Sequence, residues 1–246
     1  MQRAAINKGS QDVIEKGERK GEDMQDFDME VYLQKLLAAC QQAFGADLLY
    51  MGLQGSWRRG EATEHSDIDV VVVLETFGTE QMRTYRRILE QVGFEERSCG
   101  FICGCRELQN WNRLELCQLQ NETQDYYGSL APLLPAYSRD DVRVYLLFSL
   151  NAFYHELCHR YIHACPEENE AAMPFYAKTV FYMLQNLYWL RDGVYYQNRK
   201  ELAAHLKGED QQLFNIMEKT RQGEPFPLEP TFEALFIWCQ GLLQRL

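Results

Sequence analysis

No run of apolar residues reaches the ~18 that a membrane-spanning helix needs, although 46% of the 246 residues are hydrophobic. The most apolar helix-like segment, residues 175–190, is interrupted by Lys178, Gln185 and Asn186. The sequence therefore excludes a protein built from membrane-spanning helices.

An export signal is also lacking, because the first residues are polar and have no apolar core segment. Residues 1–26 predict a flexible leader. With no export signal, we expect a cytoplasmic protein whose eight cysteines are reduced. Cys99, Cys103 and Cys105 lie close together, but without a second cluster they indicate ordinary packing rather than a zinc site.

Basic residues are in the minority, with 25 Lys and Arg against 36 Asp and Glu and a formal net charge of −11. Such a surface repels phosphate backbones, so general nucleic-acid binding is disfavoured. Neutral partners or cationic small molecules suit this charge better.

The pattern of apolar residues divides the chain into two parts. Residues 28–135 predict helices at 28–45 and 79–92 and strands at 47–53, 67–74, 100–105 and 114–119. From residue 138 helical spacing continues to the end, in segments at 139–164, 171–192, 197–206, 208–221 and 229–245. We expect an α/β (α+β) domain with a small mixed sheet over residues 27–135, followed by an all-α helical-bundle domain over residues 136–246.

The residues that carry chemistry lie between the first two strands. Side chains alternate along a strand, so Asp67 and Asp69 point to one face, about 7 Å apart at ~3.3 Å per residue. Two carboxylates at this spacing can hold Mg²⁺ together with substrate phosphates. Gly55 permits close approach of a phosphate, Ser56 offers hydrogen-bond donors, and Arg59 can neutralise a departing pyrophosphate.

This string resembles the motif of the polymerase-β-like nucleotidyltransferase superfamily, a Gly-Ser followed by Asp-x-Asp at the start of an apolar strand. The matching positions are Gly55, Ser56, Arg59, Gly60, Ser66, Asp67, Ile68 and Asp69. The resemblance implies that Asp67 and Asp69 are catalytic ligands of two Mg²⁺ ions. It also implies that Gly55, Ser56, Arg59 and Ser66 bind the nucleoside triphosphate, with ATP as the donor.

Active members of that superfamily usually carry a third carboxylate on a later strand between apolar residues. Leu114-Glu115-Leu116 matches this setting best, so Glu115 is the predicted third catalytic and metal-binding acid. Glu107 and Asp125 are rivals, and a missing third acid would indicate a catalytically silent nucleotide-binding module.

The order of the two domains resembles aminoglycoside and lincosamide nucleotidyltransferases. Lys178, Tyr182, Gln185 and Trp189 share one helical face. One hypothesis is that Lys178 contacts the triphosphate while the aromatic residues line the acceptor pocket. The alternative is a face of core aromatic residues with a lysine that reaches to solvent.

His155-Glu156-Leu157-Cys158-His159 matches the zinc-protease pattern H-E-x-x-H. No acid or histidine between Phe175 and Arg191 can supply the third ligand, so zinc is disfavoured. We consider instead that Glu156 faces the cleft and activates the acceptor hydroxyl, against the alternative of a solvated helix face.

The sequence thus predicts a Mg²⁺-dependent nucleotidyltransferase that moves AMP from ATP onto a hydroxyl of a small molecule such as an aminoglycoside-like antibiotic. An antitoxin-like enzyme that modifies a protein partner is the rival. The oligomeric state is open.

Overall fold

The computed structural model describes residues 27–246, so the leader predicted for residues 1–26 lies outside the described residues. Helix α1 (Met29–Phe44) is capped at its start by Asp28, whose carboxylate accepts hydrogen bonds from two backbone N–H groups. Gly45 caps its other end. No helix of the described part is long and apolar enough to cross a bilayer.

Four strands form one mixed sheet in the order β3-β2-β1-β4. Strand β1 (Leu48–Leu53) pairs antiparallel with β2 (Ile68–Leu74) and with β4 (Gln124–Tyr127), whereas β2 pairs parallel with β3 (Ser98–Gly104). Between them lie the short helix α2 (Gly55–Arg59) and helix α3 (Thr79–Val92).

Different segments of the chain pack on the two faces of the sheet. Alternate residues of β2, among them Ile68 and Val70, pack under α1 and α3. The intervening residues Val71 and Val73 face the other way, toward α4 (Cys105–Gln109) and the segment around Leu130. Because side chains alternate, Asp67 and Asp69 emerge on this second face, away from α1 and α3.

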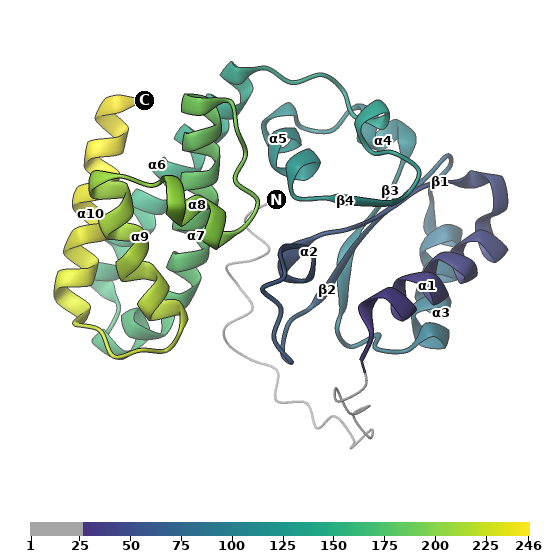
Figure 1. Ribbon diagram of the computed structural model, residues 1–246, viewed down its shortest axis with the longest axis horizontal. Coiled ribbons are helices and arrows are strands. Elements are labelled where there is room, and N and C mark those ends of the chain that lie inside the picture. The colour runs from purple at the N-terminus through teal and green to yellow at the C-terminus, as the bar shows by residue number, and fades with distance from the viewer. Residues whose placement is uncertain (1–26) are drawn as a thin grey trace.

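Helices α6 (Arg139–His163) to α10 (Leu228–Arg245) form a bundle beside the sheet (Figure 1). Helix α7 (Pro166–Asp192) packs against α6 and α9 (Gly208–Arg221), and α8 (Arg199–His205) is short. The predicted fold class, a small mixed sheet followed by a helical bundle, is confirmed. The domain limits at residues 135 and 136 stay a prediction.

The strand predicted at residues 114–119 is wrong. These residues belong to helix α5 (Arg113–Asn121), which begins at Asn112, whose side chain accepts from Leu114 N at 3.2 Å. A short apolar run is compatible with the period of a strand and with that of a helix. Here the Asn112 cap favours the helix. The sequence also predicted α7 from residue 171, but it begins at Pro166, a residue suited to the first helical turn. Strand β4 was not predicted at all.

Candidate active site

The two aspartates lie where β2 begins. Ile68 is 0% exposed and Val70 is 3% exposed, so both anchor the strand in the core below. Asp69, between them, is half-buried, and Asp67 is exposed immediately before the strand. Both carboxylates raise the pKa of the same thiol, that of Cys99 on β3, so both lie near it.

The Gly-Ser turn is packed directly against Asp69. The Gln54 N–H donates to the Asp69 carbonyl at 2.8 Å, and Gly55 follows with a φ of 71°. A β-carbon on Gly55 would lie 2.0 Å from Asp69 Oδ2, so only glycine fits. Ser56 is the next residue, in the first turn of α2. The proximity that the sequence predicted between the turn and the aspartate is therefore present.

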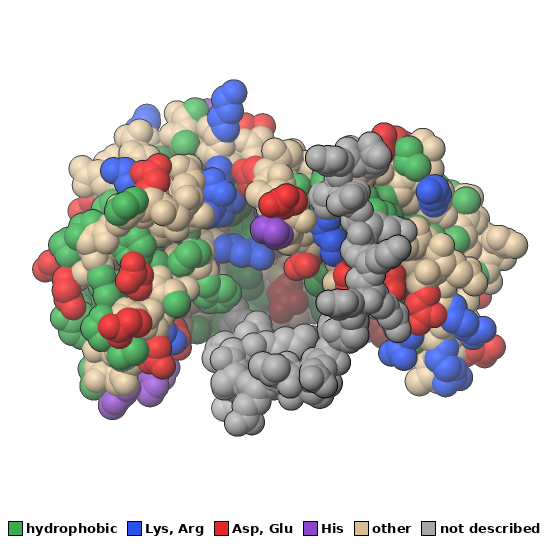
Figure 2. Space-filling model, turned by 90° about the horizontal axis from the view of Figure 1, so that it is seen from below, with side chains coloured by type: hydrophobic (Ala, Val, Ile, Leu, Met, Phe, Trp, Pro, Cys, Tyr) green, Lys and Arg blue, Asp and Glu red, His purple; other side chains and the backbone are tan. Residues whose placement is uncertain are grey.

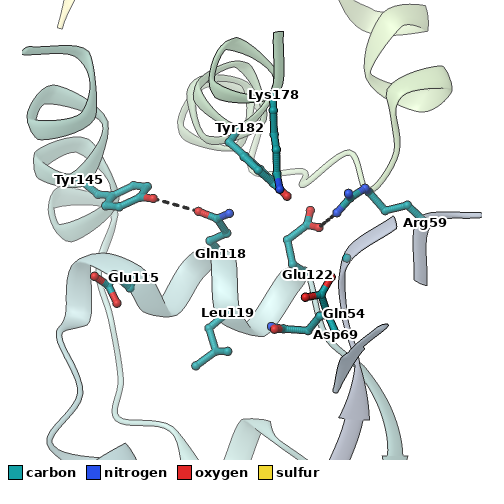
Figure 3. A pocket seen from close by; sticks show the side chains of 11 residues that line it. Gln54, Arg59, Asp69, Glu115, Gln118, Leu119, Glu122, Tyr145, Lys178 and Tyr182 are labelled. Carbon is teal, nitrogen blue, oxygen red and sulfur yellow. Dashed lines mark hydrogen bonds and ion pairs between the residues drawn. The ribbon is translucent and has the colours of Figure 1, made fainter. Parts of the chain in front are cut away.

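A cavity of about 360 Å³ opens in front of this turn, between the sheet and the helical bundle. Figure 2 shows a hollowed surface between these two parts of the molecule, with charged side chains of both signs around it. The cavity is lined by residues from α2, β2, α5, α6 and α7, namely Gln54, Gly55, Arg59, Asp69, Glu115, Gln118, Leu119, Glu122, Tyr145, Lys178 and Tyr182. Lys178 and Tyr182 descend from α7 into it (Figure 3).

The Asp69 carboxyl has a pKa above the ordinary value, chiefly because burial withdraws it from water. Lys178 opposes this rise, the Asp67 carboxylate adds to it, and a hydrogen bond from the Cys99 thiol lowers it. A divalent cation between Asp67 and Asp69 would relieve both the desolvation and the mutual repulsion. Two carboxylates beside a cradle that only glycine fits are a donor set suited to Mg²⁺ and a phosphate.

Arg59 reaches the cavity but is already paired. Its guanidinium donates to Glu122 at 2.7 Å and to Glu61 at 3.2 Å, and its side chain is only 6% exposed. Arg199 of α8 binds the same Glu61 at 3.0 Å. The pair of Glu61 with Arg199 joins the segment after α2 to the helical bundle. The two pairs of Arg59 leave it less free to bind pyrophosphate than the sequence suggested.

The predicted setting of the third carboxylate is also wrong. Glu115 lies on helix α5 instead of a strand, accepts from Trp111 Nε1 at 2.9 Å, and stands across the cavity from Asp69 (Figure 3). Among its rivals, Glu107 is on α4, and Asp125 accepts the Tyr50 hydroxyl at 2.8 Å. Among residues 27–246 no group of three or more His, Cys, Asp or Glu side chains is placed to hold a metal ion.

Sequence reasoning missed two residues near Asp69. Cys99 pairs with Asp69 in the parallel register of β3 and β2, so it occupies the neighbouring-strand position next to that carboxylate. Glu122 follows α5 and is 5% exposed, with Gln185 donating to it at 3.0 Å and Arg59 at 2.7 Å. Neither residue has a local motif to reveal it.

Ser66 does not line the cavity. Its hydroxyl accepts from the Thr63 N–H at 2.9 Å and so closes the turn before β2. On α7, Gln185 is fully buried, and Trp189 packs on Tyr137 with a ring distance of 6.0 Å. Of the predicted helical face, only Lys178 and Tyr182 therefore reach the cavity.

Glu156 lines a second cavity of about 380 Å³, between α6 and α7, that shares Tyr145 and Tyr182 with the first. Arg160 lies 3.9 Å from its carboxylate. His155 and His159 are exposed on the same helix with ring centroids 6.3 Å apart. Because residues 27–246 offer no third ligand there, the zinc-protease pattern has no structural support.

Three comparisons with known proteins bear on this site. Residues 33–125 match the model of the nucleotidyltransferase domain family. A stretch of 41 residues, 17% of the chain, is 46% identical to MJ1305 of Methanocaldococcus jannaschii, provisionally named a protein adenylyltransferase. That match covers 28% of the relative's length.

Among solved structures, spectinomycin adenyltransferase AAD(9) from Enterococcus, determined with ATP and spectinomycin, is similar to this chain. The TM-score is 0.53 at 15% identity, over 87% of this chain and 100% of that one. This likeness shows a common fold. Together the comparisons confirm the family resemblance and the layout that the sequence predicted.

Proposed function

Because residues 33–125 form a nucleotidyltransferase domain within the fold of a spectinomycin adenyltransferase, we propose that this protein moves AMP from ATP onto a hydroxyl of a small molecule. The observation that carries the proposal is the contact between Gly55 and the Asp69 carboxylate, with Lys178 facing both across one cavity. Phosphate, cation and acceptor can meet there.

In this proposal Asp67 and Asp69 hold Mg²⁺, which supplies charge neutralisation when bound. Gly55 and Ser56 let the backbone approach the triphosphate, and the acceptor hydroxyl attacks the α-phosphorus while pyrophosphate leaves. Positioning by the two walls of the cavity and neutralisation of charge supply most of the acceleration. Arg59 contributes by holding Glu122 and α2 in place.

The test is a screen with ATP labelled on the α-phosphate, Mg²⁺ and a panel of hydroxyl-bearing antibiotics. We expect label to appear on at least one small molecule with the wild-type chain and not with Asp67→Asn. Label that appears equally with both chains, or on no small molecule, would contradict the proposal.

A protein acceptor is the second candidate, favoured by the 41-residue match to MJ1305. It predicts that label from the same ATP transfers to a partner protein recovered with the chain. A third possibility, a silent nucleotide-binding module, draws on the missing cluster of three acids among residues 27–246. It predicts ATP binding without release of pyrophosphate.

We expect Lys178→Met to weaken ATP binding by about 10- to 100-fold, the range for loss of one charge-assisted contact. The ammonium group of Lys178 is near enough to lower the Asp69 pKa, and it lies where a triphosphate would need a counter-charge. Calorimetric titration with ATP measures this. Lys35→Met, at an exposed position of α1, is the matched control. Unchanged ATP affinity in Lys178→Met would refute the role proposed for Lys178.

Glu156 is proposed as the group that accepts the proton of the acceptor hydroxyl, since it lines the cavity next to that of Asp69. We expect Glu156→Gln to reduce the rate by about 10²- to 10⁴-fold and to abolish the acid limb of its pH profile. Glu170→Gln, exposed on α7, should leave the profile unchanged. A normal acid limb in Glu156→Gln rules out this assignment.

A further inference from the structure

Helix α6 exposes apolar side chains on the face that points away from the core of the bundle. Its opposite face, which includes Leu146 and Leu150, is buried in that core. On the outward face of a surface helix, polar and charged side chains normally predominate. Here Val144, Phe148 and Ile162 are 47%, 59% and 71% exposed. Exposed apolar side chains gathered on one face indicate a contact surface.

The outward face of α6 also lacks charge. Between Val144 and Ile162 the sequence has only two residues of the types Asp, Glu, Lys and Arg, namely Glu156 and Arg160, although such residues make up 25% of the chain. Both turn toward α7, since Arg160 donates to the Asn169 side chain at 3.3 Å and Glu156 lines the cavity between α6 and α7. Depletion of charge distinguishes the centre of a protein interface from the rest of a surface.

The net charge of the chain indicates what can cover this face. Each copy carries a formal charge of −11, so two copies repel one another across most of their surfaces. Two copies can approach only where the surfaces between them are uncharged. A cationic partner, in contrast, would be drawn to acidic side chains, which the outward face of residues 144–162 does not offer. The face therefore suits a second copy of the chain.

The order of residues along this face makes it complementary to itself. The outward residues recur every three or four positions, in the order Val144, Phe148, Asn151, His155, His159 and Ile162. They form one row about 27 Å long, at ~1.5 Å per residue. In an antiparallel pair of these helices, Val144 lies opposite Ile162 of the second copy, and Phe148 lies opposite the ring of His159. At the centre the Asn151 amide lies opposite the His155 imidazole, with which it can form a hydrogen bond.

We propose that the chain forms an antiparallel, two-fold symmetric dimer through the outward face of α6. In such a dimer each contact occurs twice, and the interface closes without leaving the same face free for a third copy. One pair of helices buries less surface than a standard interface, so the dimer should dissociate in the micromolar range. This association goes beyond the proposed function and holds whether or not the chain transfers nucleotides.

Sedimentation velocity of the full chain, at concentrations from ~1 μM to ~1 mM, tests the proposal. We expect monomers at the low end and dimers at the high end. Val144→Glu should weaken dimerisation by about 10²-fold or more, because a carboxylate would face Ile162 of the second copy and the change occurs twice in each dimer. Val31→Glu is the matched control, since Val31 is 44% exposed on α1, and it should dimerise as the wild-type chain does.

A double variant tests the antiparallel arrangement. Ile162→Lys alone should also weaken the dimer. Val144→Glu combined with Ile162→Lys should restore it, because the new carboxylate of one copy would face the new ammonium group of the other. Within one chain the two positions are about five helical turns apart, so they cannot pair internally. Thermal melting of every variant should stay close to that of the wild-type chain, because both positions are exposed.

The proposal is overturned if the wild-type chain remains monomeric at the highest concentration. It is also overturned if Val144→Glu dimerises normally, because the interface would then lie on another surface. A double variant that dimerises no better than the single variants would rule out the antiparallel pairing of α6 with itself.

Discussion

Asp69→Asn is expected to lower the rate of nucleotidyl transfer by about 10²- to 10⁴-fold, the effect of losing a ligand to a cation that neutralises charge in the transition state. The same variant should be no less stable than the wild-type chain. The folded state raises the Asp69 pKa, chiefly through burial, so the folded chain holds that proton more tightly than the unfolded chain. The stability that this confers is present at low pH and is lost as pH rises through the raised folded value.

At neutral pH and without metal, the buried charge of the Asp69 carboxylate therefore lowers the stability of the folded chain. The neutral amide of Asn removes this penalty. Thermal melting without divalent ions at several pH values measures this, beside transfer rates with Mg²⁺. Glu75→Gln, exposed just beyond the far end of β2, is the matched control and should change neither. A large loss of stability in Asp69→Asn would show that the carboxylate supports the fold instead of the reaction.

Gly55→Ala is expected to reduce the rate of nucleotidyl transfer by about 10²-fold or more. The new methyl group would displace the Asp69 carboxylate, on which the positioning of the reactants depends. The new methyl group would stand 2.0 Å from Asp69 Oδ2, and the backbone has a φ of 71°. The unfavourable φ alone should cost about 1–2 kcal/mol of stability. Steady-state rates and thermal melting together measure both effects.

Gly60→Ala separates the two causes. Gly60 has a φ of 68°, but a β-carbon there would meet nothing within 4 Å. We expect Gly60→Ala to lose similar stability from the backbone and to keep most of the activity. Equal losses of activity in the two variants would mean that the contact with Asp69 is not what matters at Gly55.

The strand of valines and the two aspartates before it could be predicted because the evidence is local. Alternation along residues 67–74 assigns each side chain to a face, and Asp28 and Gly45 mark the ends of α1 by their own chemistry. The relation of Gly55 to Asp69 followed from a motif with a known spacing. For these features the neighbouring residues decide the conformation.

Glu115 and Glu122 show where local evidence fails. The run at residues 114–119 fits a strand or a helix, and a single cap at Asn112 selects the helix. Glu122 gains its place from Arg59 and Gln185, each 63 positions away in the sequence. A contact at that distance leaves no periodic trace, so only the folded chain reveals it. The second cavity likewise depends on how α6 and α7 pack.

Two contacts link the bundle to the sheet part of the molecule, the ion pair of Arg199 with Glu61 and the hydrogen bond that Gln185 donates to Glu122. Moving the bundle away from the sheet would break both, whereas Arg59 and Glu122 lie on the same side of the cleft and would stay paired. Both contacts would have to be given up before the cleft could widen, so they favour the narrow arrangement of sheet and bundle seen here.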